Sequence, residues 1–224
     1  RLEKGLIMRP RRPVFGESFI LETVHCFKAA RVTQGFSESE LRWARDVLDE
    51  YFAVMASSPI VDAARKDYEV DGPATRAATA ARATFSPYPA SFLPDTDITF
   101  DDLLTLFTRR RSIRWYKDKP VPHAAIQKVV EAALLAPSAC NRQPFRFVVA
   151  NGRNVASRIA GCAGGTAGFA HQVPAVIVVV GDLSSYPFER DRHLIYIDAS
   201  LASMQLMLAA ETLGLATCPI NWPD

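Results

Sequence analysis

The chain has 224 residues, of which 49% are hydrophobic and 22% are charged, a composition typical of a folded globular protein. Its net charge of +2, from 26 basic and 24 acidic residues, is too balanced to indicate a nucleic-acid partner. The longest strongly apolar run, residues 173–181, has nine residues. A membrane-spanning helix needs roughly 20 residues, and no signal-peptide pattern opens the chain. We therefore expect no nucleic-acid partner and no membrane.

The cysteines and histidines are widely dispersed and form no CxxC pair. This spacing predicts neither a zinc site nor a disulfide framework. Few cysteines and no secretion signal favour a reducing, cytoplasmic location. The residues concerned are Cys26, Cys140, Cys162 and Cys218, with His25, His123, His171 and His193.

Residues 1–70 are predicted to form a helical N-terminal extension. Apolar residues recur at helical spacing from Ile20 to Phe27. A second helix begins after Ser37, which forms a capping-box pattern with Glu40. We expect the buried stripe of this second helix to consist of Leu41, Ala44, Leu48, Phe52 and Met55. Residues 71–96, rich in Ala, Thr and Pro, are predicted to form a surface linker.

Residues 97–224 alternate helices and strands, which indicates a sandwich of the α/β or α+β class. Thr99 caps a helix with Asp101 and Asp102 in its first turn, and a second helix runs from Pro122 to Pro137. Strands are expected at residues 145–150 and 175–180, the second of them β-branched throughout and therefore covered on both faces.

A long last helix is predicted from about Asp198, with Gly214 as its stop. The predicted order across this region is helix, helix, strand, helix, strand, helix. The side chains expected to point inward are Phe100, Leu103, Leu104 and Phe107 in the first of these helices and Leu201, Met204, Leu208 and Leu213 in the last.

The densest chemical signal is the sequence RRRSIR at residues 109–114, directly after a predicted helix. One interpretation is a solvated charge run at the negative end of that helix. The other is an anion site, in which guanidinium groups fork onto phosphate oxygens and a serine hydroxyl donates a further hydrogen bond. The segment lacks the glycines of a P-loop and the interleaved aromatic residues of a nucleic-acid surface.

Two further segments carry weaker signals. Residues 136–145, APSACNRQPF, place the amides of Asn141 and Gln143 between two prolines, where they are either part of an ordinary loop or contacts to the polar edge of a heterocycle. Residues 214–221, GLATCPIN, leave a helix end and can present backbone N–H groups beside a planar ligand.

In this order and spacing, the three segments resemble recurrent blocks of the nitroreductase-like family of flavin enzymes. The resemblance covers about residues 97–224 and implies an α+β, three-layer sandwich with a central mixed sheet flanked by helices. Residues 1–70, with EKGL at 3–6 and Phe15-Gly16, resemble an extension found in some bacterial members. Since the family continues beyond the last block, we expect this domain to be C-terminally incomplete.

The resemblance also implies FMN at a homodimer interface, with no metal and no catalytic side chain, because the flavin carries the chemistry. The phosphate side of FMN would be bound by Arg110, Arg111, Ser112 and Arg114. The partner subunit would reach the flavin with Pro137, Ser138, Ala139 and Asn141, supported by Gln143. Pro219, Ile220 and Asn221 would line the ring, with a backbone N–H near Asn221 facing the flavin N5.

The function implied is an FMN-dependent oxidoreductase in which NADH or NADPH reduces an electron-poor small-molecule acceptor, such as a nitroaromatic or a quinone, by a ping-pong cycle. One alternative is a non-catalytic flavin- or partner-binding protein, motivated by the long region before the core. Another is an arginine cluster that binds anions or RNA without a flavin.

Overall fold

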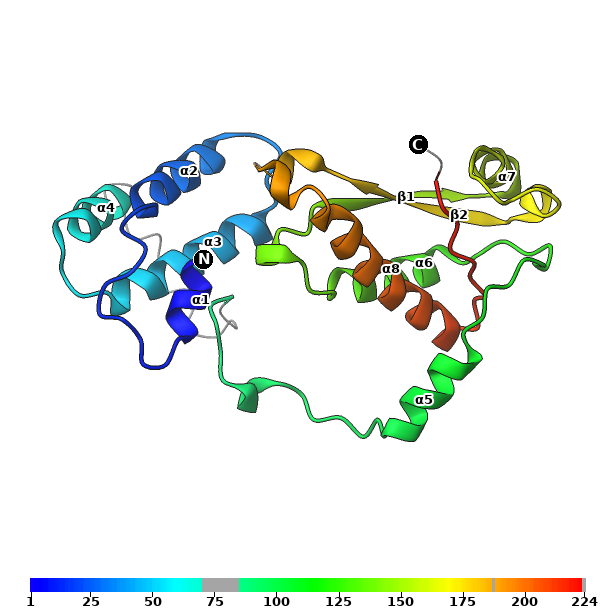
Figure 1. Ribbon diagram of the computed structural model, residues 1–224, viewed down its shortest axis with the longest axis horizontal. Coiled ribbons are helices and arrows are strands. Elements are labelled where there is room, and N and C mark those ends of the chain that lie inside the picture. Colours follow the sequence, from blue (N-terminus) through cyan, green and yellow to red (C-terminus); the bar gives the residue numbers. More distant parts are fainter. Residues whose placement is uncertain (70–84, 187, 223–224) are drawn as a thin grey trace. The chain divides into compact units, whose positions relative to one another are not determined.

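The computed structural model describes residues 1–69, 85–186 and 188–222, and these form two compact units, Arg1–Asp95 and Thr96–Asp224 (Figure 1). Residues 71–84 of the predicted linker lie outside the described residues. The helices of the first unit are α1 (Leu2–Ile7), α2 (Ile20–Val32), α3 (Glu38–Val54) and α4 (Pro59–Glu69). The second unit contains α5 (Phe100–Arg109), α6 (His123–Leu134), β1 (Phe145–Asn151), α7 (Arg153–Cys162), β2 (Ala175–Gly181) and α8 (Leu194–Thr212).

The first unit is helical and has its own hydrophobic core. The predicted capping box of α3 is confirmed: the Ser37 amide donates to the Glu40 carboxylate at 2.7 Å, and the Glu40 amide donates to the Ser37 hydroxyl at 3.2 Å. Leu48 of the predicted stripe is buried. Tyr51, which the stripe left out, is also fully buried, and its hydroxyl donates to the Phe15 carbonyl at 2.6 Å.

The second unit has three layers, and its α+β class is confirmed. Strands β1 and β2 pair antiparallel, with Phe145 opposite Gly181. Alternate side chains of a strand point to opposite faces. Ile177 and Val179 accordingly pack on the core formed with α6 and α8, and Val176 packs on the core around α7. Figure 1 shows α7 above the strands and α6 and α8 below them.

The predicted strands and their order are confirmed, and β2 is half-buried from Ala175 to Val180 with helices on both faces. Within the described residues β2 pairs along one edge, with β1. A separate parallel bridge joins Ser112 to Thr217. The regular ladder is therefore antiparallel, and the parallel component is this single bridge.

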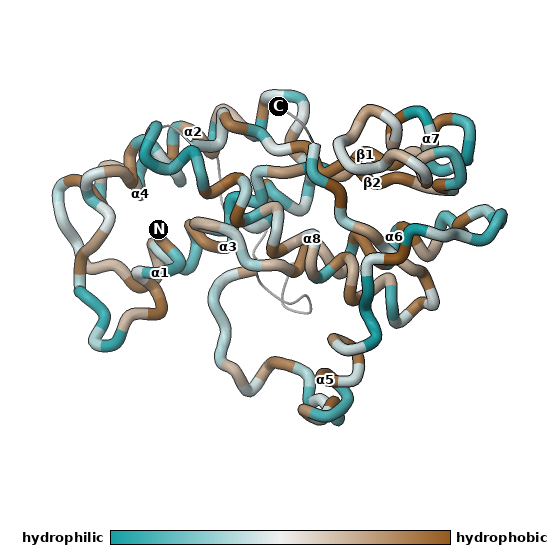
Figure 2. Tube along the Cα trace, turned by 45° about the vertical axis from the view of Figure 1, so that its right-hand side comes forward, coloured by the Kyte–Doolittle hydropathy of each residue, from teal (hydrophilic) through white to brown (hydrophobic). Residues whose placement is uncertain are grey.

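The predicted inward face of α8 is wrong. Leu201, Met204 and Leu213 are exposed, and Leu208 is only partly buried. The buried residues are Ile195, Asp198, Ala202, Leu206 and Ala210. Figure 2 shows brown, hydrophobic residues recurring along the whole of α8, so hydrophobic periodicity cannot select a face. The small alanines face α6 because they allow the two helices to pack closely.

The predicted buried face of α5 is also wrong. Phe100, Leu103, Leu104 and Phe107 are 75%, 39%, 48% and 43% exposed. Helix α5 contacts α8 within the second unit, and these four apolar side chains nevertheless remain exposed to solvent. The pattern that indicates an amphipathic helix was correct, but a pattern cannot show what covers the apolar face.

By length and composition, residues 189–212 include the one helix in the described part of the chain that could cross a membrane. Counting consecutive apolar residues in the sequence does not detect this helix, because polar residues interrupt its apolar stretch. The same helix carries Ala202, Leu206 and Ala210 into the core with α6 and the strands. The structure therefore places α8 as a core helix of the second unit.

Candidate functional site

The arginine segment follows directly from the end of α5. The predicted Thr99 cap is confirmed as a capping box, in which the Thr99 amide donates to Asp102 at 2.9 Å and the Asp102 amide donates to the Thr99 hydroxyl at 3.1 Å. Helix α5 ends at Arg109, and Arg110 already has extended backbone angles of φ −60° and ψ 117°. The residues after Arg109 are therefore presented along an extended chain.

The structure brings this segment together with residues 214–221. Gly214 ends α8 with φ +71°, a left-handed conformation that favours glycine. The chain then runs parallel to the arginine segment: Ser112 bridges Thr217, and the Ile113 amide donates to the Thr217 carbonyl at 3.0 Å. Two of the three segments singled out in the sequence are thus adjacent.

An ion pair also joins α5 and α8 at this junction. The Arg109 Nε lies 3.2 Å from the Glu211 Oε1, which ties the end of α5 to the last turn of α8. Arg109 is therefore committed to a carboxylate, whereas no carboxylate of the described residues lies within 4.0 Å of the guanidinium groups of Arg110, Arg111 or Arg114. Three arginines without a counter-charge on one short stretch can attract a phosphate.

Gln172 holds the arginine segment from the other side, and sequence reasoning missed it. Its Nε2 donates to the Arg114 carbonyl at 3.1 Å, and its Oε1 accepts from the Tyr116 amide at 3.3 Å. Burial raises the pKa of Tyr116 to about 12, with a further contribution from nearby Cys218. No local signal marks Gln172, because its partners lie more than fifty residues earlier in the chain.

The loop at residues 137–144 has a strained backbone. Cys140, Asn141 and Gln143 have φ values of 56°, 52° and 46°, in the left-handed region that non-glycine residues rarely adopt. Two bonds of Gln143 brace the loop: its amide donates to the Ser138 hydroxyl at 2.9 Å, and its Nε2 donates to the Leu134 carbonyl at 2.7 Å. Such strain persists only where surrounding contacts enforce it, and it clusters at functional sites.

Asp198 of α8 anchors this loop, a role that the sequence did not reveal. Its side chain is buried, and both carboxylate oxygens lie 3.1 Å from the Ala139 amide nitrogen. The Tyr186 hydroxyl donates to the same carboxylate at 2.7 Å. Burial, together with the hydrogen bond to Asp198, raises the pKa of Tyr186 well above its usual value, so this hydroxyl remains a donor at physiological pH.

The loop does not join the other two segments within one chain. It is tied to α8 at Asp198, whereas the arginine segment is tied to α8 at Glu211. Thirteen residues of helix separate these anchors (211 − 198), which corresponds to about 20 Å at 1.5 Å per residue. The predicted cofactor residues therefore form two groups at opposite ends of α8.

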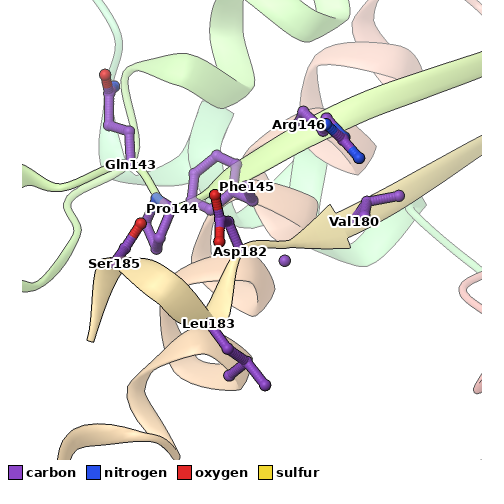
Figure 3. A pocket seen from close by; sticks show the side chains of 9 residues that line it. Gln143, Pro144, Phe145, Arg146, Val180, Asp182, Leu183 and Ser185 are labelled. Carbon is purple, nitrogen blue, oxygen red and sulfur yellow. The ribbon is translucent and has the colours of Figure 1, made fainter. Parts of the chain in front are cut away.

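A pocket of about 570 Å³ lies beside the loop, at the start of β1 and the end of β2 (Figure 3). Its lining includes Gln143, but it contains no residue of the arginine segment or of residues 214–221. The wall is formed by Gln143, Pro144, Phe145, Arg146, Val180, Gly181, Asp182, Leu183 and Ser185. This pocket is therefore separate from the paired segments.

Comparison with known proteins identifies similarity to one family of enzymes. The model of the Nitroreductase family matches residues 107–166 and 156–224, together just over half of the chain. A candidate NADH dehydrogenase/NAD(P)H nitroreductase of Archaeoglobus fulgidus is 34% identical over 122 residues, covering 52% of this chain and 66% of that protein. The FMN reductase [NAD(P)H] of Bacillus subtilis is 28% identical over 136 residues, covering 54% of each protein.

Among solved structures, an FMN-dependent nitroreductase from Clostridium difficile superimposes with a TM-score of 0.46 and 31% sequence identity, covering 51% of this chain and 64% of that one. The chain thus spans less than two thirds of the length of each of these three proteins.

Proposed function

This chain belongs to the nitroreductase family, and from this premise we propose that it is an FMN-dependent oxidoreductase. It takes electrons from NADH or NADPH and passes them to an electron-poor small molecule, such as a nitroaromatic compound or a quinone. The observation that carries the proposal is the pairing of the arginine segment with residues 214–221, because the arginines proposed to bind the phosphate then lie beside the chain proposed to line the flavin. The names of relatives as NAD(P)H-dependent reductases support it.

The residues present fit FMN. Among the described residues, Arg110, Arg111 and Arg114 have no carboxylate partner, and the Ser112 hydroxyl makes no hydrogen bond. These four side chains can therefore bind the phosphate. Beyond the Ser112–Thr217 bridge, Pro219, Ile220 and Asn221 are exposed and would lie along the flavin ring. Bound FMN supplies the electron-transfer chemistry, while the chain binds and orients it.

We propose that the active form is a homodimer in which the loop at 137–144 of each subunit reaches the flavin of the other. The separation of about 20 Å along α8 supports this, because within one chain the loop is anchored near the start of α8 and the arginine segment near its end. Exposed apolar residues on α8, including Ile197, Leu201 and Met204, and the apolar face of α5 supply surface that a second copy can bury.

We propose a cytoplasmic location. Cys26, Cys140, Cys162 and Cys218 are all free thiols, and a reducing compartment keeps thiols in this form.

An absorption spectrum of the purified protein, recorded before and after anaerobic addition of NADH or NADPH, tests the proposed function. We expect two visible flavin bands that bleach with at least one nucleotide. Bands that persist with both nucleotides would favour a flavin-binding role without this reductase activity. A colourless protein that also fails to bind added FMN would overturn the proposal.

A further inference from the structure

The backbone of Ala139 is held at both of its polar groups. Its amide nitrogen donates to the Asp198 carboxylate, with 3.1 Å to each oxygen, and its carbonyl accepts from Arg142 Nη1 at 3.3 Å. Ala139 immediately precedes Cys140 and Asn141, the first two residues of this loop with positive φ. The position of this peptide therefore determines where the strained part of the loop begins.

Tyr186 connects Asp198 and Arg142, the two side chains that bond to the Ala139 backbone. Its hydroxyl donates to Asp198 at 2.7 Å, and the Arg142 guanidinium lies over its ring at 5.4 Å from the centroid. Ala139, Asp198, Tyr186 and Arg142 therefore form a closed network of four residues. Asp198 and Tyr186 are 3% and 7% exposed, so water competes little for these bonds.

The network also opposes strain in the loop at 137–144. A loop with three non-glycine residues at positive φ tends to relax unless tertiary contacts oppose it. Asp198 opposes relaxation with a charged acceptor, which makes stronger hydrogen bonds than a neutral one. Since α8 is a core helix, the carboxylate is a rigid reference point for the loop.

We propose that Asp198, oriented by Tyr186, is a positioning residue for the cofactor of the partner subunit: it holds the Ala139 peptide so that the loop at 137–144 is preformed to contact the flavin across the dimer interface. This inference rests on the proposed function. Neither Asp198 nor Tyr186 needs to touch the flavin, since both act through the backbone of the loop.

The first test measures FMN affinity of Asp198→Asn and Tyr186→Phe by quenching of flavin fluorescence. In Asp198→Asn, an NH₂ group replaces one of the two oxygens that accept from Ala139, and we expect the Kd for FMN to rise about tenfold, the loss of one charge-assisted hydrogen bond. Ser203→Ala is the matched control, because among the described residues the Ser203 hydroxyl bonds to the Ala199 carbonyl of its own helix and to no part of the loop. Its Kd should equal that of the wild type.

The second test distinguishes positioning in trans from general damage to the fold. Asp198→Asn subunits are mixed with Arg114→Ala subunits, which carry an intact loop. Each mixed dimer then contains one site with both lesions and one site with neither. After random exchange of equal amounts, about a quarter of all sites should bind FMN with wild-type affinity, although neither parent protein does. Absence of this recovery would overturn the proposal.

Three further outcomes are decisive. Wild-type affinity in both Asp198→Asn and Tyr186→Phe would overturn the inference while leaving the proposed function intact. If Asp198→Asn does not fold, Tyr186→Phe, which keeps the carboxylate, takes its place in both tests. If the wild-type protein binds no FMN, the proposed function fails, and hydrogen exchange of residues 138–143 still tests the network. Exchange should be faster in Tyr186→Phe, and an unchanged rate would refute the network as the restraint on the loop.

Discussion

Asp198 and Glu211 lie on the same helix, α8, and each anchors a different segment of the candidate site: Asp198 accepts from the Ala139 amide, and Glu211 pairs with Arg109. The helix thus serves as a spacer of about 20 Å between the two groups of residues that we propose to bind the cofactor. This relationship keeps apart, within one subunit, segments that are predicted to bind the same FMN.

Arg110→Ala and Arg114→Ala should each weaken FMN binding by about 1.5–3 kcal/mol, the usual contribution of a hydrogen bond to a charged group. The reason is that each guanidinium lacks a carboxylate partner among the described residues and is available to the phosphate. Titration with FMN measures the effect. Arg158→Ala, which removes an exposed arginine on α7, is the control and should bind as the wild type does. Unchanged affinity in both site variants would remove the phosphate assignment.

Gln172→Ala should loosen the arginine segment, because it removes the bonds to the Arg114 carbonyl and the Tyr116 amide. We expect a loss of about 0.5–1.5 kcal/mol of unfolding free energy per hydrogen bond. A higher Kd for FMN should accompany this loss. Chemical denaturation and FMN titration on the same samples provide both values. Gln127→Ala, at an exposed position of α6, should change neither, and a Gln172 variant indistinguishable from it would contradict the prediction.

Leu201→Glu should shift the proposed dimer to monomer, because it places a charge on the exposed apolar face of α8. Sedimentation velocity at several protein concentrations would report the change, and loss of FMN binding should follow it. Val155→Glu is the control, since Val155 is exposed on α7, on the opposite side of the strands from α8. A Leu201 variant that remains dimeric would exclude this face as the interface.

The capping box of α5 should make stability depend on pH. Hydrogen bonds from the Thr99 hydroxyl and backbone amide lower the pKa of Asp102 in the folded protein. A carboxyl with a lowered folded pKa stabilises the fold above its ordinary pKa of about 3.9, and this contribution is lost as the pH falls through the folded value. The stability difference between wild type and Asp102→Asn should therefore be present at pH 7 and shrink below about pH 4. Asp101→Asn, one residue earlier and outside the box, should show a smaller difference at pH 7, measured by denaturant unfolding. Equal differences for both variants would contradict the role of the box.

Local features were predictable from the sequence. The capping boxes at Ser37 and Thr99 involve residues three positions apart, so their chemistry is visible in a short window. The stop at Gly214 depends on the conformational freedom of one residue. The two strands follow from their β-branched and aromatic composition, and the order of elements then indicates the class of fold.

The faces that are buried were decided by tertiary structure. On α8, apolar residues surround the axis, and only packing against α6 selects Ala202, Leu206 and Ala210 over Leu201 and Met204. On α5, the amphipathic pattern was plain in the sequence. The pattern does not determine whether the apolar face packs on the same chain or on another, because that depends on the surface that covers it.

The candidate site shows the same division. The sequence by itself determined which side chains have the chemistry for a phosphate and a heterocycle, because that depends on residue type in short motifs. The tertiary structure decided that Ser112 lies beside Thr217, that Gln172 holds Arg114, and that Asp198 holds Ala139. These contacts join residues more than fifty positions apart, and their geometry follows from the packing of helices and strands, which no local pattern encodes.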